Sequence, residues 1–356
     1  MKRKNLIVKR KVKKKKKTIK NLQIKKFYKK FKEIIFKNIK KEPFALGVSG
    51  GSDSMCLAYF SSIYASEFNN KIHTLIVNHN LRKESFKESK KVKEILKKKG
   101  IESKILHWKK KIPKKNIQGN ARNMRYSLIS DYCFKNKIKY LITGHHLDDQ
   151  VENFFIRLIR GSGLTGLSSM SESVDLNKNL KIIRPFLNSK KINLKHVTEN
   201  YFKTYIFDPS NDNEKFLRIR IRKHRKEMEK EGLSTDKIIK TIDNLLSANK
   251  ALNFYKNKAL EKHASFISKN KCALNERIFY EESGEIIFKS FSDVLSLIAA
   301  KYYPPRSKKI ISLINRIKKN NFIKATLGGC VIEKENGFVL ISKESNPKKT
   351  TYQLQK

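Results

Sequence analysis

The sequence predicts a doubly wound α/β domain built on a parallel sheet, followed by a mostly helical linker and a smaller mixed C-terminal region. From Pro43 onward, short apolar runs alternate with amphipathic stretches, as in strands joined by crossover helices. A glycine-rich segment at residues 49–54 separates the first such strand from the first such helix. After residues 208–211 the apolar runs give way to long, charged helical patterns, which indicates a different architecture there.

The α/β domain is expected to contain four parallel strands and four helices. The strands are short and apolar, and they cover residues 44–48, 72–77, 101–106 and 140–143. Helical spacing of apolar residues alternates with them at residues 53–65, 84–99, 121–135 and 147–160. Gly100 and Gly161 follow two of these helices, where glycine favours a left-handed helix end.

The remaining chain is expected to be helical first and mixed afterwards. Helices are predicted at residues 213–229, 235–268, 291–303 and 307–319. Short strands are predicted at residues 322–326, 330–334 and 337–341, with Asn336 and Gly337 as a strong hairpin signal. We therefore expect a basic flexible tail at residues 1–22, the α/β domain at 23–212, and the linker with the C-terminal region at 213–356.

The chain carries a large positive charge. Its 356 residues include 81 Lys and Arg against 32 Asp and Glu, which gives a formal net charge of +49. Such a field attracts polyanions, so nucleic acid is the first candidate partner and an anionic membrane surface the second. Coding-sequence drift toward Lys, Asn and Ile produces a similar bias, so charge alone decides little. Nine of the 15 Arg residues fall between residues 122 and 225, where bidentate phosphate contacts are expected.

The sequence indicates a cytoplasmic protein without a membrane span. A span needs about 18 consecutive apolar residues and a secretory signal needs roughly 7–15, and the chain has neither. Cys56, Cys133, Cys272 and Cys330 form no Cys-x-x-Cys pair, so neither a disulfide framework nor a metal knuckle is indicated. The four thiols are expected to be reduced and buried. The sequence does not assign an oligomeric state.

Residues 49–54 carry the clearest functional signal. They are Ser49, Gly50, Gly51, Ser52, Asp53 and Ser54. Adjacent glycines let the backbone approach a ligand, and the amides at the start of the next helix point toward it, which makes a cradle for phosphate. The serine hydroxyls add donors, whereas a carboxylate among phosphates is explained by a Mg²⁺ ion bound to Asp53. A plain Gly-Ser turn is the structural alternative.

The order Ser-Gly-Gly-x-Asp-Ser resembles the ATP pyrophosphatase (PP-loop) superfamily, whose fold is of the adenine nucleotide α-hydrolase type. The Gly-x-x-x-x-Gly-Lys-Ser/Thr pattern of kinase-type loops is missing. The resemblance implies that ATP binds with its pyrophosphate in the loop while a substrate oxygen attacks the α-phosphate. A nucleophile then displaces AMP, and members of the superfamily use ammonia, sulfur or lysine for this step.

Two further segments lie where ligand-binding residues are expected. Asn78, His79 and Arg82 follow the second predicted strand, at the carboxyl edge of the sheet. Arg122 and Arg125 are three residues apart near a helix start, so they share one helix face. Taken alone, His79 could be a satisfied imidazole and the arginines a solvated face. Their position beside the loop favours contacts with substrate and phosphate.

A third segment, residues 144–153, follows the fourth predicted strand. It includes His145, His146, Asp148 and Asp149. A metal cluster is one interpretation, although the His-Glu-x-x-His spacing of zinc hydrolases is absent. We favour carboxylates that hold an ammonium group and a magnesium ion. The sequence leaves open whether these carboxylates bind an α-amino group or accept a proton as the amine attacks.

In their order along the chain, these segments and residues 183–187 resemble the tRNA(Ile)-lysidine synthetase family over residues 43–225. The resemblance implies a cytoplasmic ligase that adenylates the C2 carbonyl of the wobble cytidine in isoleucine tRNA with a CAU anticodon. L-lysine then displaces AMP and forms a C–N bond, which changes codon recognition from AUG to AUA. Residues 208–211, followed by Arg218 and Arg222, match the segment that leads into the family's helical region, and residues 326–330 resemble a pattern of its shorter members.

The family resemblance also implies roles for individual side chains. The implied catalytic residues are Asp53, His79, Arg122, His145 and Asp149, with Asp53 also the Mg²⁺ ligand. The implied substrate-binding residues are Asn78, Arg82, Arg125, Asp148, Arg218 and Arg222. The loop of residues 49–54 is expected to hold ATP, and the helices and C-terminal region beyond residue 213 are expected to contact tRNA with an affinity that falls as salt rises.

Three other functions are compatible with parts of the sequence. A PP-loop tRNA thiolase would use catalytic cysteines or a Cys-x-x-Cys cluster, and the chain has no such pair. An amide-forming synthetase for a small metabolite would leave the charge of +49 unexplained. A non-enzymatic RNA-binding module would retain tRNA but would release no pyrophosphate when lysine is supplied.

Overall fold

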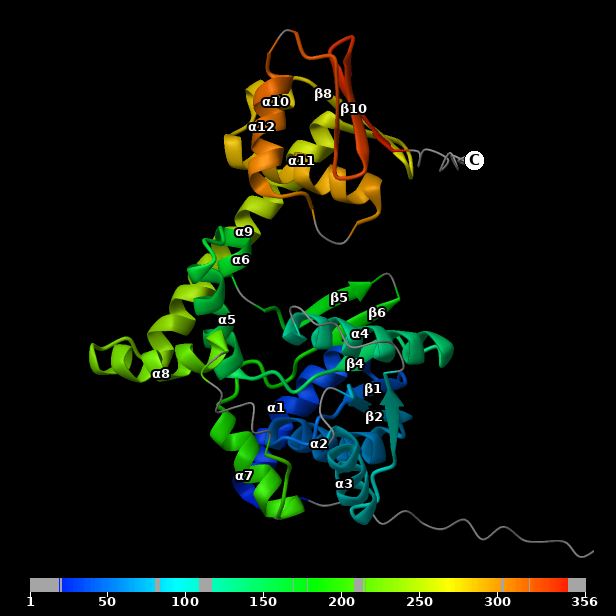
Figure 1. The fold of residues 1–356 in the computed structure, drawn as a ribbon, viewed down its shortest axis with the longest axis vertical. Coiled ribbons are helices and arrows are strands. Elements are labelled where there is room, and N and C mark those ends of the chain that lie inside the picture. The colour runs from blue at the N-terminus through cyan, green and yellow to red at the C-terminus, as the bar shows by residue number, and fades with distance from the viewer. Residues whose placement is uncertain are drawn as a thin grey trace, which may run out of the picture. The chain divides into compact units, whose positions relative to one another are not determined.

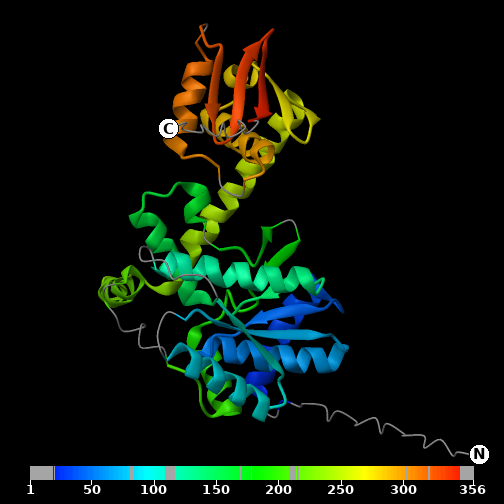
Figure 2. The same cartoon turned by 45° about the vertical axis from the view of Figure 1, so that its right-hand side comes forward.

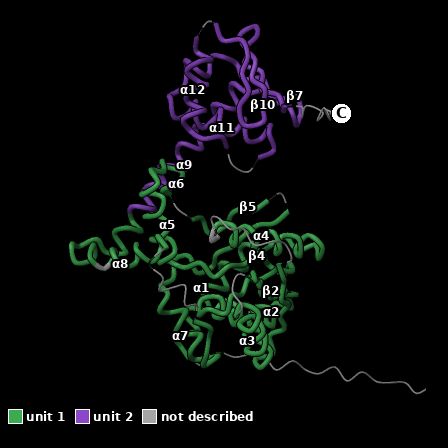
Figure 3. Tube along the Cα trace, in the orientation of Figure 1, with its two compact units in different colours: residues 1–240 green, residues 241–356 purple. Residues whose placement is uncertain are grey.

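A computed structural model describes residues 19, 21–80, 84–108, 117–168, 170–177, 179–207, 214, 216–301, 304–319 and 321–344. By its internal contacts the chain divides into two compact units, residues 1–240 and residues 241–356 (Figure 3). The expected boundary between residues 212 and 213 falls inside the first unit. Most of the expected tail and all of residues 208–211 lie outside the described residues.

A six-stranded sheet with the order β3-β2-β1-β4-β6-β5 forms the centre of the first unit (Figure 1). The middle strand β1 (Phe44–Gly47) pairs in parallel with β2 (Ile72–Asn78) and with β4 (Tyr140–Ile142). The parallel part continues to β3 (Ser103–His107) on one side and β6 (Leu180–Ile183) on the other. The edge strand β5 (Ser173–Asn177) is antiparallel to β6. The chain thus winds outward from β1 in both directions, which confirms the predicted fold class.

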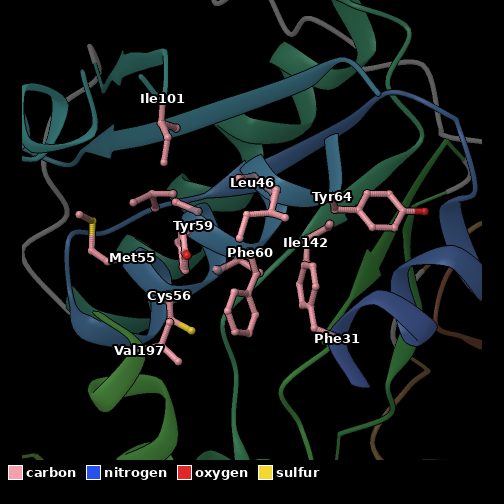
Figure 4. Packing of buried hydrophobic residues seen from close by; sticks show 14 of the residues in the cluster. Phe31, Leu46, Met55, Cys56, Tyr59, Phe60, Tyr64, Ile101, Ile142 and Val197 are labelled. Atoms are coloured by element: carbon pink, nitrogen blue, oxygen red, sulfur yellow. The ribbon is translucent and has the colours of Figure 1, made fainter. Parts of the chain in front are cut away.

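Helices cover both faces of this sheet (Figures 1 and 2). Along β1, Phe44 and Leu46 join one core and Ala45 joins the other, as the two-residue repeat of a strand requires. The first core also contains residues of α1 (Leu22–Ile39), α2 (Ser52–Phe68), α3 (Ser85–Lys98) and α7 (Lys191–Phe202). Figure 4 shows Phe31, Leu46 and Phe60 within it. The second core is closed by α4 (Ile117–Lys135).

Helix α1, the β5–β6 hairpin and helix α7 lie outside the elements predicted from the sequence. Helix α1 is amphipathic, and its buried residues recur every three or four positions, at Ile24, Tyr28, Phe31, Ile35 and Ile39. The side chain of Asn21 caps the helix, because its Oδ1 atom accepts the backbone N–H groups of Gln23 and Ile24 at 2.9 and 3.2 Å. Helix α1 runs toward the amino edge of the sheet, where β1 begins.

The helical prediction for residues 264–268 is wrong. After α5 (Leu147–Ile159), α6 (Leu164–Leu167) and α8 (Leu217–Lys230), the long helix α9 runs from Thr235 to His263 and ends there. The next residues form β7 (Ala264–Ser268), which pairs with β8 (Lys271–Asn275). Pairing with a neighbouring strand thus outweighs the local helical pattern at this point.

The second unit contains a five-stranded antiparallel sheet with the order β7-β8-β11-β10-β9. The predicted hairpin joins β10 (Cys330–Glu335) to β11 (Phe338–Lys343), and its turn residues Asn336 and Gly337 have φ angles of 48° and 78°. Strand β9 is Lys324–Leu327, and the helices are α10 (Ile278–Glu281), α11 (Gly284–Ala299) and α12 (Ser307–Ile317). Their apolar residues share one core with the sheet. None of the described helices combines the length and hydropathy that crossing a membrane requires.

Candidate functional site

Residues 49–54 form a tight loop between the carboxyl end of β1 and α2. The hydroxyl oxygen of Ser54 accepts the backbone N–H groups of Ser49 and Gly50, at 3.2 and 3.1 Å. The same hydroxyl donates to the carbonyl oxygen of Gly51 at 3.0 Å, and Gly51 is the N-cap residue of α2. The loop therefore folds back onto the first turn of the helix. Because the first amides of a helix have no intrahelical acceptor, this geometry suits an anion.

Gly50 is required at its position by both backbone and packing. Its φ angle is +95°, and an added β-carbon would lie 2.4 Å from Cγ2 of Val92 and 3.2 Å from Cγ1 of Ile206. The Gly50 carbonyl oxygen also accepts the N–H of Ile206 at 2.9 Å, so the segment after α7 closes against the loop. The loop is held between α3 and this segment.

Replacing Gly50 by alanine is expected to lower the free energy of unfolding by about 1–3 kcal/mol more than replacing Gly100 by alanine. Both residues have positive φ angles, but the space around Gly100 contains no atom within 4 Å of the added β-carbon. The difference therefore isolates the overpacking against Val92 and Ile206. Urea unfolding of both variants measures it, and equal losses would contradict the packing argument.

The loop lies where the chain reverses its direction of winding, since β1 is placed between β2 and β4. Ligands of open α/β sheets bind at the carboxyl edge at such a point. Gly144, which follows β4, permits the close approach, because a β-carbon there would lie 3.1 Å from the carbonyl oxygen of Asp53. The structure thus brings residues 144–149 against the start of α2.

His146 stands between three carboxylates. Its Nε2 atom lies 3.5 Å from Oδ2 of Asp53 and 3.5 Å from Oδ2 of Asp149, and its Nδ1 atom lies 3.7 Å from Oδ2 of Asp148. The side chain is buried. Burial lowers the pKa of His146, but the hydrogen bond to Asp53 and the three negative charges together raise that pKa above its ordinary value of 6.5. His146 therefore favours the positively charged form more than a free histidine does.

Asp53 and Asp149 are fixed on the same imidazole. Burial raises the pKa of Asp53, but the hydrogen bond and charge of His146, with the charge of Lys191 and a bond from the Ser52 hydroxyl, bring that pKa below 3.8. Asp149 also accepts the backbone N–H of His146 at 3.0 Å, which places its carboxylate at the first turn of α5. From the sequence, His146 is considered only as a member of a possible metal cluster and not as a site residue, although it follows His145 in the same segment.

His145 has the opposite character. Its Nδ1 atom lies 2.8 Å from the hydroxyl oxygen of Thr143. Burial lowers the pKa of His145 to about 3; the charge of Asp149 opposes this effect, and those of Arg184, Arg122 and Arg218 reinforce it. His145 is therefore a neutral imidazole at physiological pH. Arg184, to which our sequence analysis assigns no role, is buried and donates to the carbonyl oxygen of Ser171 at 2.7 Å.

Asn78 and His79 occupy the carboxyl end of β2. Arg125 approaches Nε2 of His79 at 3.4 Å, and burial together with the Arg125 charge lowers the pKa of His79 to about 4. The Oδ1 atom of Asn78 accepts the N–H of Asn80 at 3.0 Å. Within the described residues, Nδ2 of Asn78 and Nδ1 of His79 are buried without a hydrogen-bond partner. Two polar atoms here are thus available to a ligand.

Arg122 and Arg125 are both exposed on α4, and the guanidinium of Arg122 lies 5.1 Å from the ring centre of Tyr126. Arg122 reaches the site through its charge, which helps to keep His145 neutral. Arg82 lies outside the described residues.

Asp148 has two partners inside the protein. Its Oδ1 atom accepts a hydrogen bond from Arg225 at 3.0 Å, and its Oδ2 atom accepts the backbone N–H of Lys191 at 3.3 Å. Burial raises the pKa of Asp148, but these bonds and the charges of His146 and Arg225 bring it below 3.8. Asp148 thus connects α5 to α7 and α8, while Asp149 faces the loop side.

Arg218 and Arg222 lie on α8 and both pair with Glu152 of α5. The Nε atom of Arg218 lies 3.1 Å from Oε2 of Glu152, and Nε of Arg222 donates to Oε1. Glu152 is 2% exposed, so its carboxylate depends on these two cations. The structure therefore gives both arginines an internal partner that spacing along the sequence does not reveal.

The carboxylates of the site fit a magnesium ion that is bound jointly with phosphates. Across the described residues, no group of three or more His, Cys, Asp or Glu side chains forms a metal centre by itself. Mg²⁺ in nucleotide sites is usually held by one or two carboxylates together with the substrate's phosphates. Asp53 and Asp149, which approach the same nitrogen of His146, supply two carboxylates beside the phosphate-binding loop.

The raised pKa of His146 predicts a pH-dependent contribution to stability. A group whose pKa is higher in the folded state stabilises fully below its unfolded pKa and loses that effect as the pH rises through the folded pKa. The stability advantage of the wild type over a His146→Gln variant is therefore expected to shrink above the ordinary value of 6.5. Urea unfolding at about pH 6 and about pH 9 measures it. An advantage that grows with pH would contradict the arrangement of charges.

Comparison with known proteins gives a family match and several relatives. A model of the PP-loop domain family matches residues 18–227. The chain is 35% identical to the tRNA(Ile)-lysidine synthase of Wolbachia pipientis wMel over 325 residues, and this alignment covers 88% of this chain and 75% of that protein. It is 33% identical to the tRNA(Ile)-lysidine synthase of Orientia tsutsugamushi (strain Boryong) over 308 residues, and this alignment covers 84% of this chain and 69% of that protein.

A solved structure resembles this chain in fold. The U34-tRNA thiolase NcsA from Methanococcus maripaludis, determined with its [4Fe-4S] cluster, aligns with a TM-score of 0.54 at 22% sequence identity. The alignment covers 63% of this chain and 78% of the thiolase chain. At this identity the match speaks for the architecture alone.

Proposed function

The chain belongs to the PP-loop family and, within it, to the tRNA(Ile)-lysidine synthases, and from this membership we propose that it attaches L-lysine to the wobble cytidine of isoleucine tRNA with a CAU anticodon. Family membership makes it an ATP-dependent tRNA-modifying ligase. The observation that carries the proposal is the meeting of the phosphate-binding loop with Asp53, His146 and Asp149 at the carboxyl edge of the sheet.

The proposed reaction needs ATP because the cytosine C2 carbonyl is a poor electrophile. In the first step the C2 oxygen attacks the α-phosphorus, the α–β phosphoanhydride bond breaks, and pyrophosphate leaves. In the second step the ε-amine of lysine attacks C2, the C2–O bond breaks, and AMP leaves with the oxygen. The amine must lose its proton to act as a nucleophile. Adenylation thus replaces oxide with phosphate as the leaving group.

The loop and two carboxylates are proposed to bind the nucleotide. The amides at the start of α2 and the serine hydroxyls of the loop would bind the pyrophosphate portion of ATP, while the amides of Ser49 and Gly50 donate to Ser54 and hold the loop in shape. Asp53 and Asp149 would hold Mg²⁺, which would supply positive charge against the phosphate oxygens. His146 holds both carboxylates in place, since it contacts each at 3.5 Å, and it favours the ionised form of Asp53 by lowering the pKa of that side chain. The positive charges of Mg²⁺ and His146 would thus lie beside the negative charges of the carboxylates and of the phosphates.

The neutral histidines suit a cationic amino acid substrate. His145 and His79, with pKa values lowered to about 3 and about 4, carry no charge at physiological pH. An imidazolium at either place would repel the incoming ammonium group of lysine. Asp148 and Asp149 are proposed to attract that group, and Asp149, whose carboxylate faces the loop, is proposed to accept its proton as the new bond forms. Arg122 and Arg125, exposed on α4, are proposed to contact phosphates.

Labelled lysine tests the proposed function directly. The full chain is incubated with ATP, Mg²⁺, labelled lysine and a transcript of the isoleucine tRNA with a CAU anticodon. Label is expected in the anticodon loop, with one AMP formed for each lysine incorporated. A transcript that carries uridine at the wobble position is the matched control and is expected to accept no label. AMP formation without lysine incorporation would contradict the proposal.

Sulfur transfer, the main alternative, is disfavoured by the environment of the cysteines. All four cysteines of the chain are buried. Burial raises the pKa of Cys56 and of Cys330, that of Cys133 to about 12 and that of Cys272 to about 11. Such thiols are poor sources of the thiolate that sulfur chemistry needs. The lysine nucleophile therefore explains the site better.

A further inference from the structure

Helix α1 presents a row of four lysines to solvent. Lys25, Lys26, Lys29 and Lys30 are all exposed, whereas the opposite face of the helix is buried in the core. Within the described part of the chain none of the four makes an ion pair; the nearest pair on this helix joins Lys32 to Glu67 at 2.8 Å. The twenty residues before the helix carry twelve Lys or Arg. This lysine row is thus a concentrated positive surface.

The lysine row works against the stability of its own helix. Lys25 and Lys29, like Lys26 and Lys30, are four residues apart, and like charges at this spacing repel each other. The first turn contains no acidic residue, although the helix dipole favours negative charge there. Each effect costs a few tenths of a kcal/mol. A polyanion bound along this face would remove the repulsion.

The row lies on the half of α1 that is nearer to the sheet edge carrying the candidate site. The rings of Phe27, in the N-terminal half of α1, and of Phe31, just past the middle of the helix, each lie 5.5 Å from that of Phe186. Phe186 follows β6 and forms a backbone bridge with His146. At the far end of α1, the Lys40 carbonyl accepts the hydroxyl of Tyr64, near the amino edge. The lysines therefore belong to the half of the helix that adjoins the site.

Charge and burial favour nucleic acid over a membrane as the partner. A helix that binds a membrane surface inserts its apolar face among the lipids. The apolar face of α1 is already buried, with Phe31, Ile35 and Ile39 at most 1% exposed. The helix can therefore offer only its charges, which suits a phosphate backbone held by counterion displacement.

Resting on the proposed function, we propose that the lysine row of α1 binds the phosphate backbone of the tRNA whose cytidine is modified at the adjoining site. It forms a nucleic-acid contact on the catalytic unit, in addition to any contact made by the C-terminal region. Because the contact is electrostatic, it contributes to affinity and salt dependence without reading the base sequence.

Two quadruple variants of the full chain test this proposal. The test variant replaces the row by glutamine, as K25Q, K26Q, K29Q and K30Q. The control variant removes the same charge from exposed lysines at the amino edge of the sheet, as K37Q, K41Q, K71Q and K98Q. Filter binding of the tRNA transcript over a range of salt gives the slope of log affinity against log salt. That slope is expected to become shallower by about 0.7–0.9 per lost contact in the test variant.

The outcomes distinguish an effect of the lysine row from an effect of net charge. They also distinguish failure of this proposal from failure of the proposed function. The control variant is expected to keep the wild-type slope and lysine incorporation, although its net charge equals that of the test variant. Equal slopes in the two variants would overturn the proposal. Binding to anionic phospholipid vesicles that depends on the four lysine side chains, together with an unchanged tRNA slope in the test variant, would also overturn it. If the wild type incorporates no lysine, the proposed function fails instead. Urea unfolding checks folding, and the test variant is expected to be at least as stable as the wild type.

Discussion

Replacement of Asp53 by asparagine is expected to lower the rate of AMP formation by roughly a hundredfold to a thousandfold, the range for loss of one preorganised charged or polar group. The substitution keeps the shape of the side chain and removes its negative charge. The loss follows because Asp53 adjoins the phosphate-binding loop and its pKa is held below 3.8, so that it is fully ionised at physiological pH. Phosphate oxygens and a carboxylate share such a site only if a cation joins them.

The measurements should separate catalysis from binding. AMP is quantified in the presence of saturating tRNA, ATP and lysine, and tRNA affinity is measured by filter binding. The affinity of the Asp53→Asn variant for tRNA is expected to stay within about twofold of the wild type, because phosphate contacts elsewhere dominate that affinity. Asp131→Asn, at an exposed position of α4, is the matched control and is expected to behave as the wild type. Full turnover by the Asp53→Asn variant would remove Asp53 from the proposed mechanism.

Replacement of both Arg218 and Arg222 by glutamine is expected to lower the free energy of unfolding by about 3–5 kcal/mol. The change leaves the carboxylate of Glu152, which is 2% exposed, without its two cations. The arginine side chains are 42% and 34% exposed, so the lower end of this range is expected. Urea unfolding followed by circular dichroism measures the loss.

A third substitution tests the cause of that loss. Adding Glu152→Gln to the double variant removes the stranded charge and is expected to restore most of the stability. R220Q with K223Q, which removes equal charge from exposed positions of the same helix, is the control and is expected to change stability by less than about 0.5 kcal/mol per substitution. A triple variant no more stable than the double would show that the arginines stabilise the fold by other contacts.

The expected strands of the α/β domain agree with the structure because their signal is local. Buried parallel strands are apolar throughout, so each run stands out against the charged helices around it. Helix α1 has the amphipathic spacing that predicts a helix, with buried residues recurring every three or four positions, and the failure to predict it is an oversight rather than a lack of local signal. The helical prediction fails at residues 264–268 because these residues pair with β8, and this pairing is not visible in their own pattern of apolar residues. Such pairings depend on neighbours rather than on propensity.

The candidate site likewise has one part that local sequence predicts and another part that only the structure reveals. The order of residues in the loop predicts the anion cradle, since glycines, serines and helix amides act within six consecutive positions. The choice between His145 and His146 could not be made in this way, because both follow the same strand. The structure turns His146 toward Asp53 and Asp149, and it leaves His145 beside Thr143 among arginine charges.

By itself the sequence determined that this protein has a doubly wound domain, a phosphate-binding loop and a family. These properties follow from periodicity and from motifs whose members are close along the chain. The tertiary structure decided which charges meet: Arg218 and Arg222 with Glu152, and Arg225 with Asp148. Ion pairs and surfaces join segments that are far apart in the chain, and only packing brings those segments to within a few ångströms of one another.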